Sequence, residues 1–354
     1  MIPFISMKKA IFKNYLLLSL LSVIVLNSCK KEQENFSQNS TITPSSSSIV
    51  DSASVMEQTK DSLIVEEPKV TESVPAAFLE TGFYNALVIP KEKKAKDSVF
   101  AFFSKKYNEQ ERYAILALNR LDSKNKWNAD TLVVPAKIDT SLMSYSPFPL
   151  QLDILSDVNK FVVFSYPLQA FGVYSNGALV KWGPTSMGKK SAQTTRGLTF
   201  ANWKKELTIS TVKSEWKLPY NFNIHNFEGI GWHQYDLPGY PASHSCLRLL
   251  MEDAKWLYKY ADTWILNPGG ASTKAKGTAV IVFGDYKWGG RKPWRKLLDD
   301  PNANNISVEE MNKLIEPNLE KIIKEQTNRI KVSDSIKAAK AIVASTLNTE
   351  PEIQ

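Results

Sequence analysis

An Asn-Gly pair between two apolar runs is the feature that most constrains the fold of this chain. Asn176 and Gly177 separate residues 168–174 from residues 178–182, and both runs are rich in aliphatic and aromatic side chains. Asn-Gly is the strongest short-range signal of a β-hairpin, because both residues tolerate the positive φ of a two-residue turn. The sequence therefore predicts two antiparallel strands joined at this pair.

Further strands are predicted on both sides of the hairpin. Residues 161–166 are β-branched and aromatic, and the runs 207–213 and 278–284 are also predicted to be strands. Short strands separated by turn residues are typical of a β-sandwich or a barrel-like domain. We therefore expect a mainly β fold with flanking helices, in the α+β class, with a sandwich-like domain over residues 151–290.

Helices are expected in the second half of the chain. Residues 252–261 have apolar side chains at helical spacing. Residues 291–354 are predicted to be a helical extension, in which Ser307 and Glu310 form a capping-box pattern. Pro317 is expected to break or kink that helix, with a second helical run after it. We interpret the extension as packed on the domain, and a partner-binding helix is the alternative.

Residues 76–150 are predicted to form a small mixed domain. Apolar side chains recur at helical spacing over residues 99–107 and 109–119, and residues 128–135 end in Leu-Val-Val-Pro. A helix that ends in Leu-x-x-Asn and a strand that closes in Leu-x-Val-Pro resemble the second half of a LysM module. The Gly-Asp-Thr-Leu strand that usually opens this module is missing, so a small helical packing domain is the alternative.

The N-terminus has the features of an export signal. Lysines precede a short apolar run that ends in Leu-Asn-Ser-Cys at Cys29, which resembles a bacterial lipobox. We predict a signal peptide over residues 1–28 and lipidation of Cys29, with an uncleaved signal anchor as the alternative. Residues 29–75 are rich in Ser, Thr and Glu and are expected to be a disordered tether. Together these features predict a lipid-anchored, periplasm-facing protein of the bacterial cell envelope.

The charge pattern restricts the partners. The chain of 354 residues has a formal net charge of +8, but no Lys/Arg block with interleaved aromatic residues. Nucleic acid is therefore a poor candidate partner. A modest basic excess suits an anionic polymer such as the cell wall, although it is also an ordinary property of a solvated surface.

The side chains best suited to nucleophilic catalysis gather in one window. The chain has two cysteines and three histidines; Cys246, His244 and His233 lie within residues 230–249, and His225 lies just before them. A cysteine with nearby histidines suits a nucleophile and its base, since an imidazole can hold the thiol as a thiolate. A buried structural cysteine is the alternative. No zinc-type Cys or His spacing and no Gly-rich phosphate loop is present, so no metal or cofactor is expected.

The same window resembles a known enzyme family. Residues 243–248 read Ser-His-Ser-Cys-Leu-Arg, which is similar to the Ser-His-Gly-Cys-x-Arg signature of L,D-transpeptidases, the cysteine enzymes that cross-link bacterial peptidoglycan. The resemblance extends over residues 160–286. Ser245 replaces the glycine of the signature, and Thr195 replaces the proline of the family's Thr-Pro-x-Gly turn. If position 245 needs a positive φ, serine carries a steric cost there that glycine does not.

The resemblance implies a role for each polar group of the window. Cys246 is expected to be the nucleophile and His233 its base, with the carbonyl of Gln234 orienting the imidazole. His244 is expected to shape the loop and to polarise the substrate carbonyl. The backbone N–H groups of Ser245 and Cys246 are expected to form the oxyanion hole.

Other side chains of the window are expected to bind substrate. Arg248 can form a bidentate bond to a substrate carboxylate or, alternatively, hold the loop through a salt bridge. Ser243, Tyr235 and Trp232 are expected to line the cleft, with packing as the alternative for the aromatic residues. His225 follows an apolar run and is expected to be structural.

The resemblance implies a peptidoglycan L,D-transpeptidase that acts on stem peptides in cell-wall biogenesis, without a cofactor. Cys246 would attack the L,D-peptide bond of a tetrapeptide stem, form a thioester, and pass the acyl group to an amine. Two alternatives stay open. With water as acceptor the enzyme is an L,D-carboxypeptidase or endopeptidase, and with a decayed site the protein is a non-catalytic peptidoglycan-binding lipoprotein.

Overall fold

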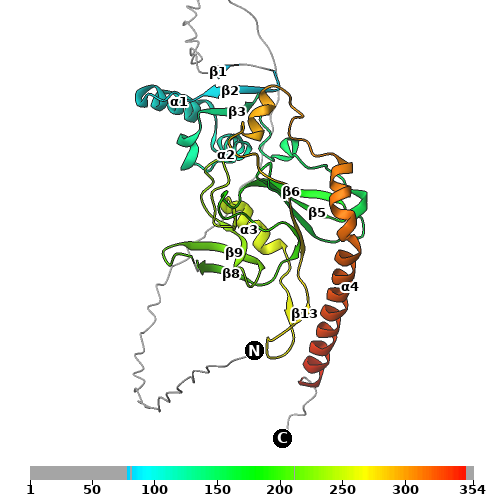
Figure 1. Ribbon diagram of the computed structural model, residues 1–354. Helices are drawn as coiled ribbons and strands as arrows, with labels where there is room; N and C mark the ends of the chain where they lie inside the picture. Colours follow the sequence, from blue (N-terminus) through cyan, green and yellow to red (C-terminus); the bar gives the residue numbers. More distant parts are fainter. Residues whose placement is uncertain (1–77, 80–81, 211, 348–354) are drawn as a thin grey trace, which may run out of the picture. The chain divides into compact units, whose positions relative to one another are not determined.

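The computed structural model describes residues 78–79, 82–210 and 212–347 (Figure 1). The predicted signal peptide, the tether and the lipidation of Cys29 lie outside these described residues. All of the described residues belong to one compact unit, Val70–Gln354. No helix in the described ranges is both long enough and apolar enough to cross a membrane.

A nine-stranded sheet dominates the structure, which confirms the predicted mainly β fold. Strand pairs β4–β14 and β10–β11 are parallel, and the remaining neighbours are antiparallel. The strands, in sheet order, are β7 (Gly197–Phe200), β14 (Ala279–Phe283), β4 (Phe161–Ser165), β5 (Ala170–Ser175), β6 (Ala178–Ser186), β11 (Leu247–Leu249), β10 (Ile230–Gln234), β9 (Lys217–His225) and β8 (Lys204–Ile209).

The predicted hairpin at Asn176 and Gly177 is confirmed. It joins β5 to β6, and φ is +48° at Asn176 and +82° at Gly177, as a type I′ turn requires. A Cβ at Gly177 would lie 2.7 Å from the carbonyl oxygen of Leu152, so the position also needs glycine for space. The predicted strand 207–213 was misplaced: β8 ends at Ile209, because the chain then turns back and Ser210 N–H bonds to the Trp216 carbonyl at 2.9 Å.

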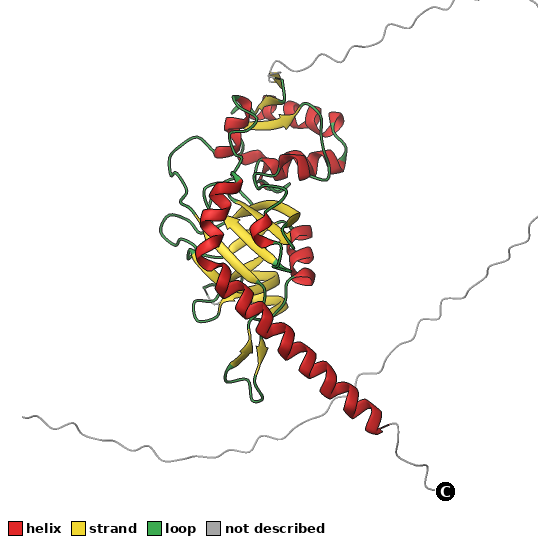
Figure 2. Cartoon of the chain, turned by 90° about the vertical axis from the view of Figure 1, so that its right-hand side faces the viewer, coloured by secondary structure: helices red, strands yellow, loops and turns green. Residues whose placement is uncertain are grey.

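The two edges of the nine-stranded sheet meet. The outermost strands β7 and β8 are joined by residues 201–203 alone, so the sheet must curl until its edges are close. Asn202 N–H donates to the Asn223 carbonyl at 2.8 Å, and Asn223 N–H donates to the Trp203 carbonyl at 2.9 Å. Figure 2 shows the resulting curled sheet with helix α4 (Val308–Leu347) along its side.

Both faces of this sheet are buried, so its central strands are apolar on both sides. On β4, Val162 and Phe164 point into the core enclosed by the curl, whereas Phe161 and Val163 point into a second core outside it. The inner core is closed by helix α3 (Met251–Tyr260), and the outer core is covered by α4 and by helix α2 (Glu109–Leu118).

Helix α4 begins at the predicted capping box but does not break at its proline. Ser307 N–H donates to the Glu310 carboxylate at 2.9 Å, and Glu310 N–H donates to the Ser307 hydroxyl at 3.1 Å. The helix spans 40 residues and continues through Pro317, so the expected break is wrong, while the alternative of a kink stays a prediction. Buried Ile315 and Ile322 hold the helix on the domain on both sides of Pro317, which offsets the lost backbone hydrogen bond.

The N-terminal unit is a β-α-α-β arrangement. Strand β2 (Tyr84–Val88) pairs antiparallel with β3 (Thr131–Pro135), and helices α1 (Lys93–Lys106) and α2 lie between them in sequence. An opening strand is therefore present, contrary to expectation: the usual sequence motif is missing, but Tyr84–Val88 pairs without it. The resemblance of this unit to a LysM module stays a prediction.

Asn119 ties the end of α2 to β3, which gives the Leu-x-x-Asn pattern a physical reason. Its side-chain amide donates to the carbonyls of Ile115 at 2.7 Å and Val133 at 2.8 Å, and its side-chain oxygen accepts from Val133 N–H at 2.8 Å. The remaining described elements are short: β1 (Phe78–Leu79), β12 (Ile265–Leu266), β13 (Thr273–Ala275) and the 3-10 helices Asn125–Asn128, Met143–Tyr145, Asp153–Leu155 and Pro293–Leu298.

Candidate active site

The parallel pairing of β10 with β11 positions the central residues of the window. His233 lies opposite Arg248 and Trp232 opposite Leu247, so Cys246, directly before β11, lies beside Gly231. The backbone N–H of Gly231 bonds to the Cys246 thiol. A Cβ at position 231 would lie 2.3 Å from the Phe222 carbonyl oxygen, so only glycine permits this close approach of β9 and β10.

His233 is buried, with 3% of its surface exposed, and its ring is held through one nitrogen. The Nδ1 atom lies 2.9 Å from the carbonyl oxygen of Gln234, which is the group that the resemblance to L,D-transpeptidases implies. A carbonyl oxygen only accepts, so Nδ1 carries the proton and Nε2 is the nitrogen left to accept one. The catalytic use of this arrangement stays a prediction.

Cys246 and His233 line one small cavity of about 30 Å³, roughly the volume of one water molecule. Most of the predicted site residues line this cavity, namely Cys246, His233, His244, Ser243, Tyr235 and Arg248. The sequence analysis missed the other wall, which comes from the β8–β9 connection and the start of β9: Ser210, Val212, Trp216 and Leu218. Trp216 was the available signal, because it is a large aromatic side chain in a short connection whose other residues are mostly polar.

Trp232 does not line the cavity, so its assignment to substrate binding is wrong. Successive side chains of a strand point to opposite faces, and His233 faces the cavity. Trp232 is therefore fully buried in the inner core, where its ring packs on Phe222 at 4.8 Å and Phe164 at 6.1 Å between centroids. His225 also lies outside the cavity, at the end of β9.

His244 is paired with a lysine that the sequence did not single out. The Lys189 Nζ lies 2.7 Å from His244 Nε2. An ammonium group only donates, so Nε2 accepts and Nδ1 carries the proton. That Nδ1 atom is buried and has no hydrogen-bond partner among the described residues. His244 therefore presents an unused N–H donor in the cavity wall that contains Cys246.

The loop before Cys246 is held in a conformation that favours glycine. Ser245 has a φ of +76°, the region in which a Cβ is disfavoured. Residues of a second loop brace it: Thr194 Oγ1 donates to the Ser245 carbonyl at 2.8 Å, and Lys189 N–H donates to the Ser243 carbonyl at 2.8 Å. The Ser243 hydroxyl donates to the Cys246 carbonyl, so Ser243 positions the loop with the hydroxyl that was expected to contact substrate.

Arg248 lies along the cavity wall without a carboxylate partner. Its guanidinium sits over the Tyr235 ring, 4.5 Å from the centroid, and its contact with the Asp236 carbonyl is long at 3.4 Å. Within the described ranges, no ion pair involves Arg248, so the alternative of a loop salt bridge is not observed. Its charge is available to a ligand. No group of three or more His, Cys, Asp or Glu side chains in the described part could hold a metal ion.

The comparison with protein families agrees with this geometry. Residues 159–282 match the model of the YkuD family, described as the L,D-transpeptidase catalytic domain. Residues 159–282 of this chain are therefore similar to the catalytic domain of L,D-transpeptidases. The match covers the curled sheet from β4 to β14 and includes all the cavity-lining residues. No curated protein sequence matches the chain.

Solved L,D-transpeptidases also resemble this domain. The enzyme from Stackebrandtia nassauensis is 26% identical, with 36% of this chain and 57% of that chain covered and a TM-score of 0.29. The enzyme from Mycobacterium smegmatis is 20% identical over 36% of this chain and 59% of that one, with a TM-score of 0.29. L,D-transpeptidase 1 from Mycobacterium tuberculosis is 22% identical over 35% and 62%, with a TM-score of 0.27. The chain thus spans less than two thirds of each of these proteins.

Burial shifts the protonation equilibria of this candidate site. It lowers the pKa of His233 to about 4, with the Arg248 charge acting in the same direction and the Gln234 carbonyl against it. Burial also raises the pKa of the Cys246 thiol, opposed by the Gly231 N–H and by Arg248. Both shifts favour a neutral thiol beside a neutral imidazole. The expected preformed thiolate is therefore not what the free site favours.

The buried His233 should make the fold sensitive to acid. The pKa of His233 is about 4 in the folded state and 6.5 in the unfolded state, so the unfolded chain takes up a proton first as the pH falls. The free energy of unfolding is therefore unaffected above pH 6.5 and decreases as the pH falls toward 4. The difference corresponds to about 3 kcal/mol. We expect the free energy of unfolding of His233→Asn, measured by denaturant titration, to decrease much less between pH 6.5 and pH 4 than that of wild type. His225→Asn should show the same decrease as wild type. Equal acid sensitivity in wild type and His233→Asn would contradict the assignment.

The protein should be more stable with glycine than with serine at position 245. Ser245→Gly removes the Cβ from a positive φ, a gain of about 1 kcal/mol, at the loss of only a long 3.3 Å hydrogen bond from the serine hydroxyl to the Ala192 carbonyl. Ser245→Val adds a β-branch at the same φ and should be less stable than wild type. Thermal unfolding of the three proteins measures the order, and a valine variant as stable as the glycine variant would show that the loop does not demand this conformation.

Proposed function

We propose that this chain is a peptidoglycan L,D-transpeptidase that forms a thioester on Cys246. The observation that carries the proposal is the cavity in which Cys246, His233, His244 and Arg248 meet on an L,D-transpeptidase domain. The acyl donor is the tetrapeptide stem of peptidoglycan, and the acceptor is an amine of a second stem.

Cys246 and His233 carry out the proton transfers. The thiol proton passes to His233 Nε2 as sulfur attacks the carbonyl of the L,D-peptide bond, because Nδ1 is already held by Gln234. The C–N bond then breaks, the leaving amine takes the proton from His233, and a thioester remains on Cys246. An incoming amine reverses these steps: it attacks the thioester, gives up a proton through His233, and the thiol is released.

Backbone and side-chain N–H groups stabilise the tetrahedral intermediate. The strand ladder of β11 begins at Leu247, so the amides of Ser245 and Cys246 lie outside it, beside the thiol. Together with His244 Nδ1–H, which Lys189 fixes as a donor, they supply three N–H groups for the oxyanion. Arg248 binds a stem-peptide carboxylate, since its guanidinium is presented along the cavity wall without an acidic partner.

Location is part of the proposal. Cys29 and the apolar run before it support a lipid anchor on the periplasmic side of the cell envelope, where the stem peptides are found. The predicted tether 29–75 would let the domain reach the polymer from the membrane. Replacing Cys29 with alanine and following the protein by membrane fractionation tests this location independently of activity.

Mass spectrometry of tetrapeptide muropeptides incubated with the protein tests the activity. We expect cross-linked dimers, each formed with loss of the terminal residue of the donor stem, and no product with Cys246→Ala, because no other thiol lies in the cavity. Loss of the terminal residue without dimers would instead identify an L,D-carboxypeptidase. Unchanged muropeptides with wild-type protein would support the non-catalytic alternative.

The contact between Lys189 and His244 should determine how the rate of acylation depends on pH. Burial lowers the pKa of His244, and the charges of Lys189, Arg248 and Lys213 lower it further, so His244 stays a neutral donor. Lys189→Met removes the cation beside His244, and it lets the His244 imidazole carry its proton on either ring nitrogen. We expect acylation to fall about tenfold and to show a new ionisation as the pKa of His244 moves back up toward the ordinary histidine range, about 6.5.

Lys189→Arg is the matched control, because arginine also only donates and also carries a positive charge. It should preserve the wild-type pH profile even if the rate changes. Stopped-flow measurements of acylation by imipenem, the compound named with one solved L,D-transpeptidase, provide the rate. Identical profiles for wild type and Lys189→Met would exclude a role for Lys189 in setting the state of His244.

A further inference from the structure

A large cavity in the described part of the chain lies away from Cys246. It has a volume of about 980 Å³, at the upper end of the range for ligand pockets, and shares no lining residue with the cavity at Cys246. Its walls come from the ends of β2 and β3 in the N-terminal unit, from residues 143–150, and from residues 301–302 and 304–308, which lead into α4. The cleft therefore exists only because the N-terminal unit packs on the catalytic domain.

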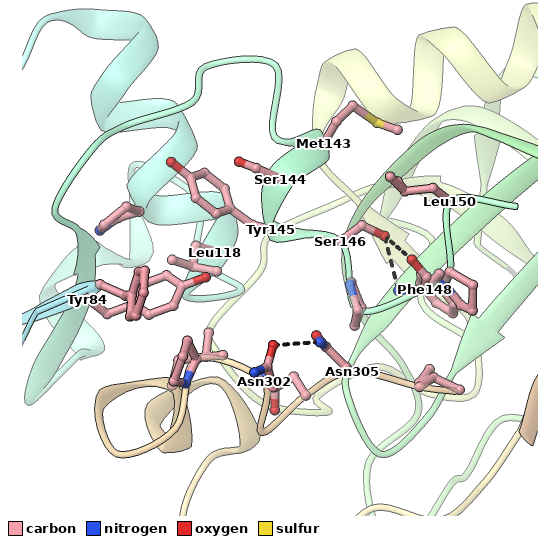
Figure 3. A pocket seen from close by; sticks show the side chains of 18 of the residues that line it. Tyr84, Leu118, Met143, Ser144, Tyr145, Ser146, Phe148, Leu150, Asn302 and Asn305 are labelled. Carbon is pink, nitrogen blue, oxygen red and sulfur yellow. Dashed lines mark hydrogen bonds between the residues drawn. The ribbon is translucent and has the colours of Figure 1, made fainter. Parts of the chain in front are cut away.

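Aromatic and carboxamide side chains line this cleft. Figure 3 shows Tyr84 and Tyr145 on one side, facing Phe148 and Leu150, with Asn302 and Asn305 along a third side. The two tyrosine rings are 6.4 Å apart at 58°. The Tyr145 hydroxyl donates to the Lys137 carbonyl at 3.0 Å, which fixes this ring. The rings thus offer flat apolar faces beside groups that can form hydrogen bonds.

Asn304 on the wall of this cleft has an unused acceptor. Only 7% of its surface is exposed, and its Oδ1 atom is buried with no hydrogen-bond partner among the described residues. The neighbouring Asn305 amide is engaged with Asn302 Oδ1 at 3.0 Å and does not serve it. A buried acceptor without a donor is unfavourable for the fold, so its presence at a cleft points to a donor supplied by a ligand.

The charges around the cleft are of one sign. Among the described residues no aspartate or glutamate lines it, whereas Lys137 and the buried Arg120 do. The Arg120 guanidinium donates to the carbonyls of Leu168 and Leu118 and lies over the Trp294 ring, and no carboxylate within the described ranges pairs with it. A cationic ligand is therefore disfavoured, and a neutral or weakly anionic ligand fits.

We propose that this cleft binds an N-acetylated amino-sugar strand, the glycan of the polymer whose stem peptides reach Cys246. The C–H faces of pyranose rings pack on tyrosine and phenylalanine rings, and hydroxyl and acetamido groups exchange hydrogen bonds with carboxamides. An acetamido N–H supplies the donor that Asn304 Oδ1 lacks. The proposal rests on the proposed function for the identity of the polymer, but the binding itself requires no catalysis.

Calorimetric titration of the full chain with the tetrasaccharide of N-acetylglucosamine tests the proposal. This probe has no stem peptide, so Cys246→Ala should bind it as wild type does. The corresponding glucose tetrasaccharide lacks the acetamido groups and should bind at least about tenfold more weakly, since each buried hydrogen bond contributes about that factor. A free stem tetrapeptide should not compete with the sugar.

The variant Asn304→Leu distinguishes an effect on ligand affinity from an effect on the stability of the fold. Leucine has as many side-chain heavy atoms as asparagine but a larger volume, and it removes a buried polar atom that has no partner among the described residues. These two effects oppose each other, so the thermal midpoint should change little. Affinity for the amino sugar should nevertheless fall about tenfold. A second pair of variants controls for exposed aromatic residues: Phe83, 76% exposed, lines the cleft, whereas Phe227, 102% exposed, does not. Phe83→Ala should weaken binding and Phe227→Ala should not.

Three results would overturn the proposal: no saturable binding of the amino-sugar probe, equal binding of the two tetrasaccharides, or unchanged affinity in both Asn304→Leu and Phe83→Ala. Competition by a peptide at this cleft would identify a peptide site instead. None of these outcomes bears on the reaction at Cys246, because the muropeptide assay measures that reaction separately. Conversely, sugar binding by a protein that leaves muropeptides unchanged would retain the site and reject only the enzyme.

Discussion

The parallel pairing of β10 with β11 is the constraint on which the candidate site depends. It brings His233 into register with Arg248 and puts Cys246 beside Gly231, although the connection 235–246 separates these strands in sequence. The pairing holds because both strands lie in the interior of a sheet whose edges meet, so neither can slip without disrupting its neighbours. The glycine at position 231 lets β9 come close enough to complete this arrangement.

The site combines several features that are individually unfavourable for folding. His233 is buried, which favours its neutral form, Ser245 occupies a glycine-type conformation, and the His244 Nδ1–H lacks a partner in the described part of the chain. Such features persist where the surrounding structure enforces them. Here the enforcement comes from the loop 187–194, whose contacts with Ser243, His244 and Ser245 hold the segment before the nucleophile from the opposite side.

The N-terminal unit is joined to the curled-sheet domain by buried polar contacts as well as by apolar packing. Arg120, at the end of α2, donates to the Leu168 carbonyl in the turn between β4 and β5, and the α2 side chains Ala114 and Ala117 enter the outer core. A rigid junction of this kind creates a fixed cleft beside the domain. In the proposed enzyme it would set the distance between a bound glycan strand and the thiol that acts on its peptides.

The sequence by itself determined the local features: the Asn-Gly hairpin, the capping box of α4, the mainly β class, and the window that contains Cys246 and its histidines, because each depends on neighbouring residues. It could not place Trp232 in the core or bring Lys189 to His244, and it could not show that Pro317 leaves α4 unbroken. Those outcomes were decided by tertiary structure, since strand register, burial and packing between distant segments fix which face a side chain takes and which charge it meets.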